Sequence, residues 1–117
     1  MWLPVRYSLR NKVVVISGGS RGLGLAMARE FASLGAHLAL LARDTNELER
    51  AAADLLHFGG PVSTWPCDVK EPHEVKQTIS AIAEKHAGID VLVNNAGIML
   101  VAPLDAKATA AFEEAMQ

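Results

Sequence analysis

The chain has little of what marks several classes of protein. Cys67 is its single cysteine, so no internal disulfide can form, and we expect a reducing, cytoplasmic location. The 11 basic side chains are outnumbered by 13 acidic ones, and the net charge of -2 argues against a nucleic-acid partner. No apolar run is long enough to cross a bilayer, and Met1 to Arg10 lacks the apolar stretch of a signal peptide. We therefore expect neither nucleic acid nor membrane as a partner.

Metal and nucleophilic chemistry also have little support. The four histidines show no metal-ligand spacing, so the sequence predicts no metal site. Ser17 and Ser20 have no evident base and orienting acid, which leaves a nucleophilic role unsupported. Cys67 has no catalytic partner in the pattern, and we expect it to be a small buried thiol.

Short apolar runs alternate with helix-like stretches over the 117 residues, a length that fits one domain at most. Buried strands are predicted over Lys12–Ser17, His37–Ala42, Val62–Cys67 and Ile89–Asn94. Helices are predicted after the glycines as far as Leu34, over Asp44–Phe58 and Pro72–His86, and, beyond a loop through Pro103, over Ala106–Gln117. This order predicts an α/β fold: a partial, Rossmann-like, doubly wound parallel sheet with strand order 3-2-1-4, truncated in the fourth helix.

The first two helices carry further signals. Near-helical spacing predicts the apolar face of the first helix at Leu23, Met27, Phe31 and Leu34. Gly35 follows where a helix C-cap belongs. Asp44 can cap the second helix, with Glu47 three residues later in capping-box position.

A glycine-rich segment, Ser17–Gly24 (SGGSRGLG), lies between the first predicted strand and the first predicted helix. A dinucleotide pyrophosphate needs backbone N–H groups at a helix N-terminus with no Cβ in the way. Gly18 can supply the tight turn, Gly22 can let the backbone approach the phosphates, and Gly24 can let the helix pack close to the sheet. The alternative is a glycine-rich turn without a ligand, whereas a P-loop would need a lysine that has no counterpart here.

The spacing G-x-x-x-G-x-G resembles the cofactor loop of the short-chain dehydrogenases/reductases, usually written T-G-x-x-x-G-x-G, with Ser17 in place of the threonine. Two further family landmarks follow in order, Cys67-Asp68-Val69 after the third strand and Asn94-Asn95-Ala96-Gly97 after the fourth. The resemblance covers nearly the whole chain. It implies a cofactor site made by Ser17, Gly18, Ser20, Arg21, Gly22, Leu23, Gly24, Arg43, Asp68, Val69, Asn95, Ala96 and Gly97.

The resemblance also implies individual roles for the landmark residues. Asp68 would accept from the adenine amine and Val69 would pack against the ring. Asn95 to Gly97 would line the floor under the adenosine ribose, and Asn94 would stabilise the end of the sheet through backbone hydrogen bonds. The alternatives are loop capping by Asp68 and an ordinary turn at Asn94 and Asn95.

The end of the second strand bears on the choice of cofactor. NAD enzymes place a carboxylate there for the ribose 2′-hydroxyl, and NADP enzymes place arginines there for the 2′-phosphate. The resemblance aligns Ala42 with the carboxylate position and Arg43 next to it, and Arg21 can approach from the glycine loop. A register shift would make Asp44 the ribose acid, but helix capping already explains Asp44. We expect NADP(H) rather than NAD(H).

The chemistry that the resemblance implies is hydride transfer between nicotinamide and a small-molecule carbonyl or alcohol. A tyrosine acts as acid/base in the family, a lysine four residues later lowers its pKa, and a serine polarises the oxygen. The single tyrosine here, Tyr7, has Asn11 four residues later, so no catalytic residue is carried over. We expect an NADP(H)-dependent oxidoreductase that is homo-oligomeric when intact. Residues 1–117 would be a single NAD(P)-binding domain, incomplete at the C-terminus and inactive alone.

Two other functions remain open at this point. A non-catalytic nucleotide-binding or interaction module would bind NADPH without needing a tyrosine-lysine pair. A doubly wound methyltransferase would want a carboxylate near Ala42 and gives no reason for Asn94–Gly97. The fourth strand is normally central in the family, but the expected truncation removes the strands beyond it. We therefore also expect Val91 to Val93 on an exposed apolar edge that promotes self-association.

Overall fold

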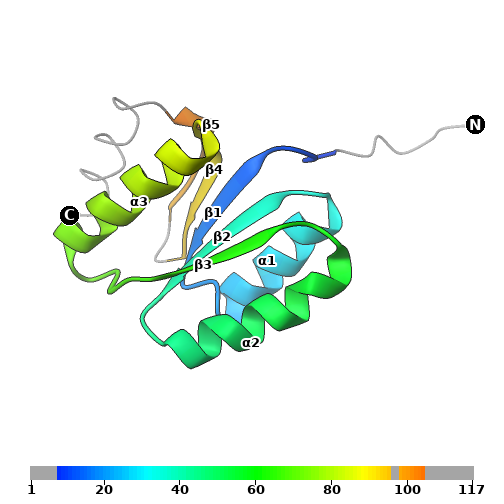
Figure 1. Ribbon diagram of the computed structural model, residues 1–117, viewed down its shortest axis with the longest axis horizontal. Coiled ribbons are helices and arrows are strands. Elements are labelled where there is room, and N and C mark those ends of the chain that lie inside the picture. The colour runs from blue at the N-terminus through cyan, green and yellow to red at the C-terminus, as the bar shows by residue number, and fades with distance from the viewer. Residues whose placement is uncertain (1–7, 96–97, 105–117) are drawn as a thin grey trace, which may run out of the picture.

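The computed structural model describes residues 8–95 and 98–104, and its strands and helices alternate along the chain (Figure 1). The strands are β1 (Val13–Ser17), β2 (His37–Ala42), β3 (Val62–Pro66), β4 (Ile89–Asn94) and β5 (Ile98–Leu104). The helices are α1 (Gly22–Ser33), α2 (Thr45–Leu55), the 3-10 helix η1 (Leu56–Phe58) and α3 (Pro72–His86). The predicted fourth helix, Ala106–Gln117, and Tyr7 lie outside the described residues.

The sheet has the order β3-β2-β1-β4-β5, and its first four strands are parallel. The predicted order 3-2-1-4 is therefore confirmed. Val14 of β1 lies beside Leu38 of β2 and Val91 of β4. From β1 the chain proceeds outward to β2 and β3, and α3 then carries it back to β4 on the other side of β1. The carboxyl ends of β1 and β4 thus frame a topological switch point, where doubly wound sheets bind their ligands.

The outer side of β4 differs from what the sequence predicts. The segment expected to be a loop through Pro103 forms β5, which pairs antiparallel with β4. The prediction of an exposed apolar edge is therefore wrong, and Val91 and Val93 are only 7% and 3% exposed. The physical reason is that an unpaired strand edge presents free N–H and C=O groups, and the apolar segment that follows β4 in the chain satisfies them.

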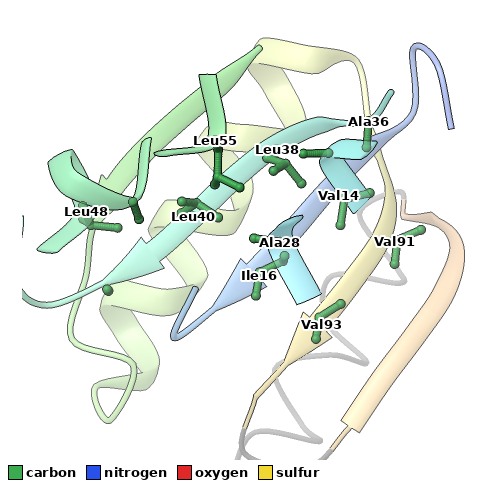
Figure 2. Close-up of a cluster of buried hydrophobic side chains, with 13 residues drawn as sticks. Val14, Ile16, Ala28, Ala36, Leu38, Leu40, Leu48, Leu55, Val91 and Val93 are labelled. Carbon is green, nitrogen blue, oxygen red and sulfur yellow. The ribbon is translucent and has the colours of Figure 1, made fainter. Parts of the chain in front are cut away.

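Helices cover both faces of the sheet (Figure 1). On one face, alternate strand residues pack with α1 and α2 in the cluster that Figure 2 shows, which includes Val14, Ile16, Leu38, Leu40, Leu48, Leu55, Val91 and Val93. On the other face α3 contributes Val75, Ile79 and Ile82 to a cluster with Val15, Leu41 and Leu92. Burial of both strand faces explains why β1, β2 and β4 read as continuous apolar runs in the sequence.

Helix α1 packs mainly through small residues, and only part of the predicted apolar face lies against the core. Its buried residues are Gly24, Ala28 and Ala32, spaced four apart. Leu23 and Leu34 are exposed, while the predicted Met27 and Phe31 are half-buried and pack against the cluster. The reason is that small side chains at this spacing let the helix axis lie close to the sheet, so the larger neighbours are displaced toward its margins.

The start of α2 follows the prediction, and the helical segment ends at the predicted Phe58 with a last turn that is 3-10. The Asp44 carboxylate accepts from the Glu47 N–H at 3.1 Å, which confirms Asp44 as the N-cap. The α-helix ends at Leu55 and tightens into η1, after which Gly59 takes a left-handed φ of 83° that stops the helix. Within the described ranges, no helix is long and apolar enough to span a membrane.

Candidate functional site

A cleft of about 640 Å³ opens where the carboxyl ends of the parallel strands meet the N-termini of α1 and α2. Its volume falls in the usual range of small-molecule sites. The glycine segment, the end of β2, the segment after β3 and the end of β4 all contribute to its wall. The lining residues are Gly18, Ser20, Arg21, Gly22, Leu23, Ala42, Arg43, Asp44, Glu47, Asp68, Val69, Lys70 and Asn95.

Two glycines of the loop have the geometry that an approaching ligand requires. Gly18 turns the chain at φ 69°, donates its N–H to the Leu41 carbonyl at 2.7 Å, and would bring a Cβ to 3.1 Å from Asn95 Nδ2. Gly22 has φ 57°, and a Cβ there would meet no atom within 4 Å, because that side of the residue faces open space. Gly18 therefore serves the turn, and Gly22 leaves the backbone open to the cleft.

Gly24 lies beneath the loop. A Cβ on Gly24 would collide with the Gly18 carbonyl oxygen and press on Gly19, so this glycine lets α1 approach the glycine segment itself. The N-terminus of α1 has no side-chain cap and no acidic residue in its first turn. Its leading N–H groups and its helix dipole are thus suited to an anion.

Ser17 fixes the end of β1 to the end of β4. Its hydroxyl oxygen accepts from the Asn95 N–H at 3.1 Å, and the hydroxyl lies within donor reach of Asn94 Oδ1 at 3.2 Å and the Val93 carbonyl at 3.4 Å. Ser17 and Asn94 are both buried. The sequence implied that Asn94 acts through backbone bonds, whereas its side chain takes part in this contact. Ser17 therefore positions Asn95, which lines the cleft, and is not itself part of the lining.

Two acidic side chains accept hydrogen bonds from the backbone of the segment after β3. Asp68 Oδ1 accepts from the Lys70 N–H at 3.0 Å, and the Asp68 N–H donates to Glu74 Oε2 at 2.8 Å. Loop capping by Asp68, the alternative left open by the sequence, therefore takes place, and Asp68 and the exposed Val69 also line the cleft. Cys67 is a buried free thiol, and burial raises its pKa, which keeps it protonated and unreactive.

Charged side chains gather where the end of β2 meets the start of α2. Arg43 is exposed and, among the residues that the structure describes, has no ion-pair partner. Arg21 lies with its Nη1 3.5 Å from Glu47 Oε1, and its side chain is 82% exposed. The hydroxyl of Ser20 lies 3.4 Å from Glu47 Oε2. Both arginines and Glu47 line the same cleft.

The structure brings most of the predicted site residues together. Nine of them line the cleft: Gly18, Ser20, Arg21, Gly22, Leu23, Arg43, Asp68, Val69 and Asn95. Ser17 and Gly24 support the loop from behind, and Ala96 and Gly97 lie outside the described residues. Sequence reasoning missed Glu47 and Lys70 as lining residues. The position of Glu47, three residues after Asp44, singled it out in the sequence, but helix capping accounted for that position. Nothing in the sequence marks Lys70 as a lining residue beyond its place after Asp68.

Away from the cleft, His86 lies at the end of α3. Burial, with Lys85 and His37 nearby, lowers its pKa, and the two histidine rings lie edge to face at 6.3 Å. Its buried Nε2 has no hydrogen-bond partner in the described structure. In the described ranges no three histidine, cysteine or acidic side chains form a group that could hold a metal ion.

Comparison with known proteins agrees with this geometry. Residues 12–117 match the family model described as short chain dehydrogenase. An uncharacterized oxidoreductase of Bacillus subtilis is 35% identical over 106 residues, which cover 91% of this chain and 41% of that protein. L-sorbose reductase from Gluconobacter frateurii, solved with NADPH and L-sorbose, superposes with a TM-score of 0.74 at 40% identity, covering 80% of this chain and 36% of that one.

A second solved structure carries the other nicotinamide cofactor. Xylitol dehydrogenase bound to NAD+ has a TM-score of 0.72 at 32% identity, covering 77% of this chain and 35% of that one. The chain therefore spans about two fifths or less of these relatives. With the family model covering the chain from Lys12 to Gln117, the protein belongs to the short-chain dehydrogenase/reductase family.

Proposed function

We propose that this chain forms the nucleotide-binding part of an NADP(H)-dependent oxidoreductase that transfers hydride between the cofactor and a small carbonyl or alcohol compound. The observation that carries the proposal is the convergence, in one cleft, of the glycine loop, the uncapped N-terminus of α1 and two arginines. A nicotinamide cofactor supplies the hydride when bound. The chain's own residues bind and orient it.

Each part of the cleft would bind a different part of the dinucleotide. The pyrophosphate would lie against the backbone of Gly18 to Gly22, where the α1 dipole and N–H groups favour negative charge. The adenine would lie near Asp68 and Val69, whose exposed apolar surface suits a ring face. The adenosine ribose would lie between these two parts, beside Asn95.

The choice of NADP(H) rests on the end of β2. The residue aligned with the ribose carboxylate of NAD enzymes is the buried Ala42, which cannot accept a hydrogen bond from a 2′-hydroxyl. Arg43 follows it at the rim of the cleft, and its planar guanidinium can bind a 2′-phosphate through two parallel hydrogen bonds. The Asp44 carboxylate is engaged in capping α2, which makes it a poor ribose acid.

Substrate turnover needs residues that this sequence does not offer. Tyr7 has no lysine four residues later, and the relatives are more than twice as long as the matched part. We therefore expect these 117 residues to bind the dinucleotide without reducing a carbonyl compound. In the intact protein, which we expect to be a cytoplasmic homo-oligomer, the remaining part would supply the acid/base chemistry.

The test is a pair of calorimetric titrations that measure the Kd values of NADPH and NADH, which differ only in the 2′-phosphate. We expect the Kd of NADPH to be at least about tenfold lower than that of NADH, in line with one charge-assisted contact to phosphate. Arg43→Gln should remove most of that preference and leave NADH binding unchanged. Arg50→Gln, an exposed arginine of α2 outside this cleft, is the matched control. Equal or tighter binding of NADH would overturn the cofactor assignment, and binding of neither would overturn the nucleotide site.

A further inference from the structure

The glycine loop and α2 are joined at the cleft by one carboxylate. Glu47 Oε1 lies 3.5 Å from Arg21 Nη1, and Glu47 Oε2 lies 3.4 Å from the hydroxyl of Ser20. Ser20 is buried and Arg21 is exposed, so the carboxylate spans from the floor of the cleft to its rim. Two adjacent donors on a single carboxylate mark a place where the loop offers hydrogen bonds to an anion.

Glu47 and Asp44 lie one helical turn apart, but their carboxylates make different contacts. The Asp44 carboxylate accepts from the Glu47 N–H and belongs to the helix cap. In a complete capping box the Glu47 side chain would return to the Asp44 N–H, but here it extends to the loop instead. The Glu47 side chain is 26% exposed, so its charge is partly shielded from water, and it lines the same cleft as Arg43.

The position of this carboxylate conflicts with a 2′-phosphate. Arg21 can approach that phosphate from the glycine loop, Ser20 precedes it in the lining of the cleft, and Glu47 contacts both. A dinucleotide with a 2′-phosphate would have to displace the carboxylate and would then lie beside a like charge. A dinucleotide with a 2′-hydroxyl meets neither obstacle, because a hydroxyl can donate to a carboxylate.

We infer that Glu47 is a specificity-determining residue that competes with the 2′-phosphate for Arg21 and Ser20 and so lowers the preference of the cleft for NADP(H) over NAD(H). The inference rests on the proposed nucleotide-binding function and adds a residue that limits it. Arg43 sets the preference for the phosphate, and Glu47 restricts how large that preference becomes.

The experiment compares the ratio of the Kd values for NADH and NADPH in the full chain and in Glu47→Gln, measured by calorimetry at low salt. We expect the ratio to rise about 5- to 10-fold, through tighter NADPH binding with NADH changed less than about twofold, since one unit charge next to the phosphate is removed. Glu49→Gln removes the same charge from an exposed position of α2 outside the cleft, and it should leave the ratio unchanged. Far-UV circular dichroism and a urea midpoint check that each variant is folded.

A second pair of variants tests whether Glu47 acts through Arg21. In the Arg21→Gln background, the gain from Glu47→Gln should shrink to less than about twofold, as coupled partners in one interaction require. Glu47→Ala serves as an independent variant if the glutamine substitution disturbs α2. An unchanged ratio in folded Glu47 variants, or a full gain that persists without Arg21, would overturn the inference while leaving the proposed function intact. Failure of the unaltered chain to bind either dinucleotide would instead overturn both.

Discussion

The hydroxyl of Ser17 joins the ends of β1 and β4, and its removal gives a quantitative test of how the cleft is held. Ser17→Ala takes away the acceptor for the Asn95 N–H at 3.1 Å and the hydroxyl at 3.2 Å from Asn94 Oδ1. Each buried hydrogen bond contributes on the order of 1 kcal/mol net, and leaving a donor unsatisfied adds to the cost. We expect the free energy of unfolding to fall by about 2 kcal/mol, or about 8 °C in Tm for a domain of this size.

The assay is urea unfolding followed by circular dichroism, with the change in midpoint read at constant m-value. Ser33→Ala is the matched control, because its hydroxyl also bonds a carbonyl, that of Glu30 at 2.7 Å, but at an exposed position. It should cost less than about 0.5 kcal/mol. Ser17→Thr keeps the hydroxyl and should lose less stability than Ser17→Ala. A loss below about 0.5 kcal/mol for Ser17→Ala would refute the role of this contact.

Two further predictions concern other parts of the fold. Gly24→Ala should destabilise the chain by about 1–3 kcal/mol in urea unfolding, because the added Cβ collides with the Gly18 carbonyl. This collision outweighs the gain in helix propensity, which is about 1 kcal/mol. An unchanged or higher urea midpoint would contradict the close approach of α1 to the glycine segment. Burial lowers the pKa of His86 in the folded chain, so the unfolded chain takes up a proton near the ordinary value of about 6.5 while the folded chain does not. Stability should therefore be complete above about pH 6.5 and decline as pH falls toward the folded pKa. His86→Gln should flatten this pH dependence in urea unfolding, and the exposed His73→Gln on the same helix should not; equal slopes in both variants would argue against the assignment.

The site could be predicted from the sequence to the extent that it depends on strand ends. In a parallel doubly wound sheet the carboxyl ends of neighbouring strands meet at one edge, so motifs that follow successive strands must share a cleft. The glycine segment and the residues that the family resemblance implies, Arg43, Asp68 and Asn95, all lie at or after strand ends, and the structure places these three and five residues of the glycine segment in the lining. Glu47 was missed because its cap position explained it, and nothing local shows that its side chain extends to a loop 27 residues earlier.

The burial of α1 shows the limit of periodicity. A helical repeat of large apolar residues predicts which side of a helix is hydrophobic, but packing distance decides which side is buried. Gly24, Ala28 and Ala32 allow a closer approach to the sheet than Leu23 or Leu34 would, and the collision that a Cβ on Gly24 would cause shows how close that approach is. The free edge of β4 was similarly misjudged, because pairing with β5 is a property of two segments together.

By itself the sequence determined the positions of the four parallel strands, the cap of α2 at Asp44 and the place of the glycine loop between β1 and α1. These features depend on residues a few positions apart, where β-branched runs, capping side chains and glycine act through local backbone preferences. Only the tertiary structure decided that Ser17 bonds to Asn94, 77 residues away, that β5 covers β4, and that Glu47 engages Ser20 and Arg21. Such contacts depend on how the crossovers bring distant segments together, and burial of the two faces of the sheet selects among the arrangements that local preferences leave open.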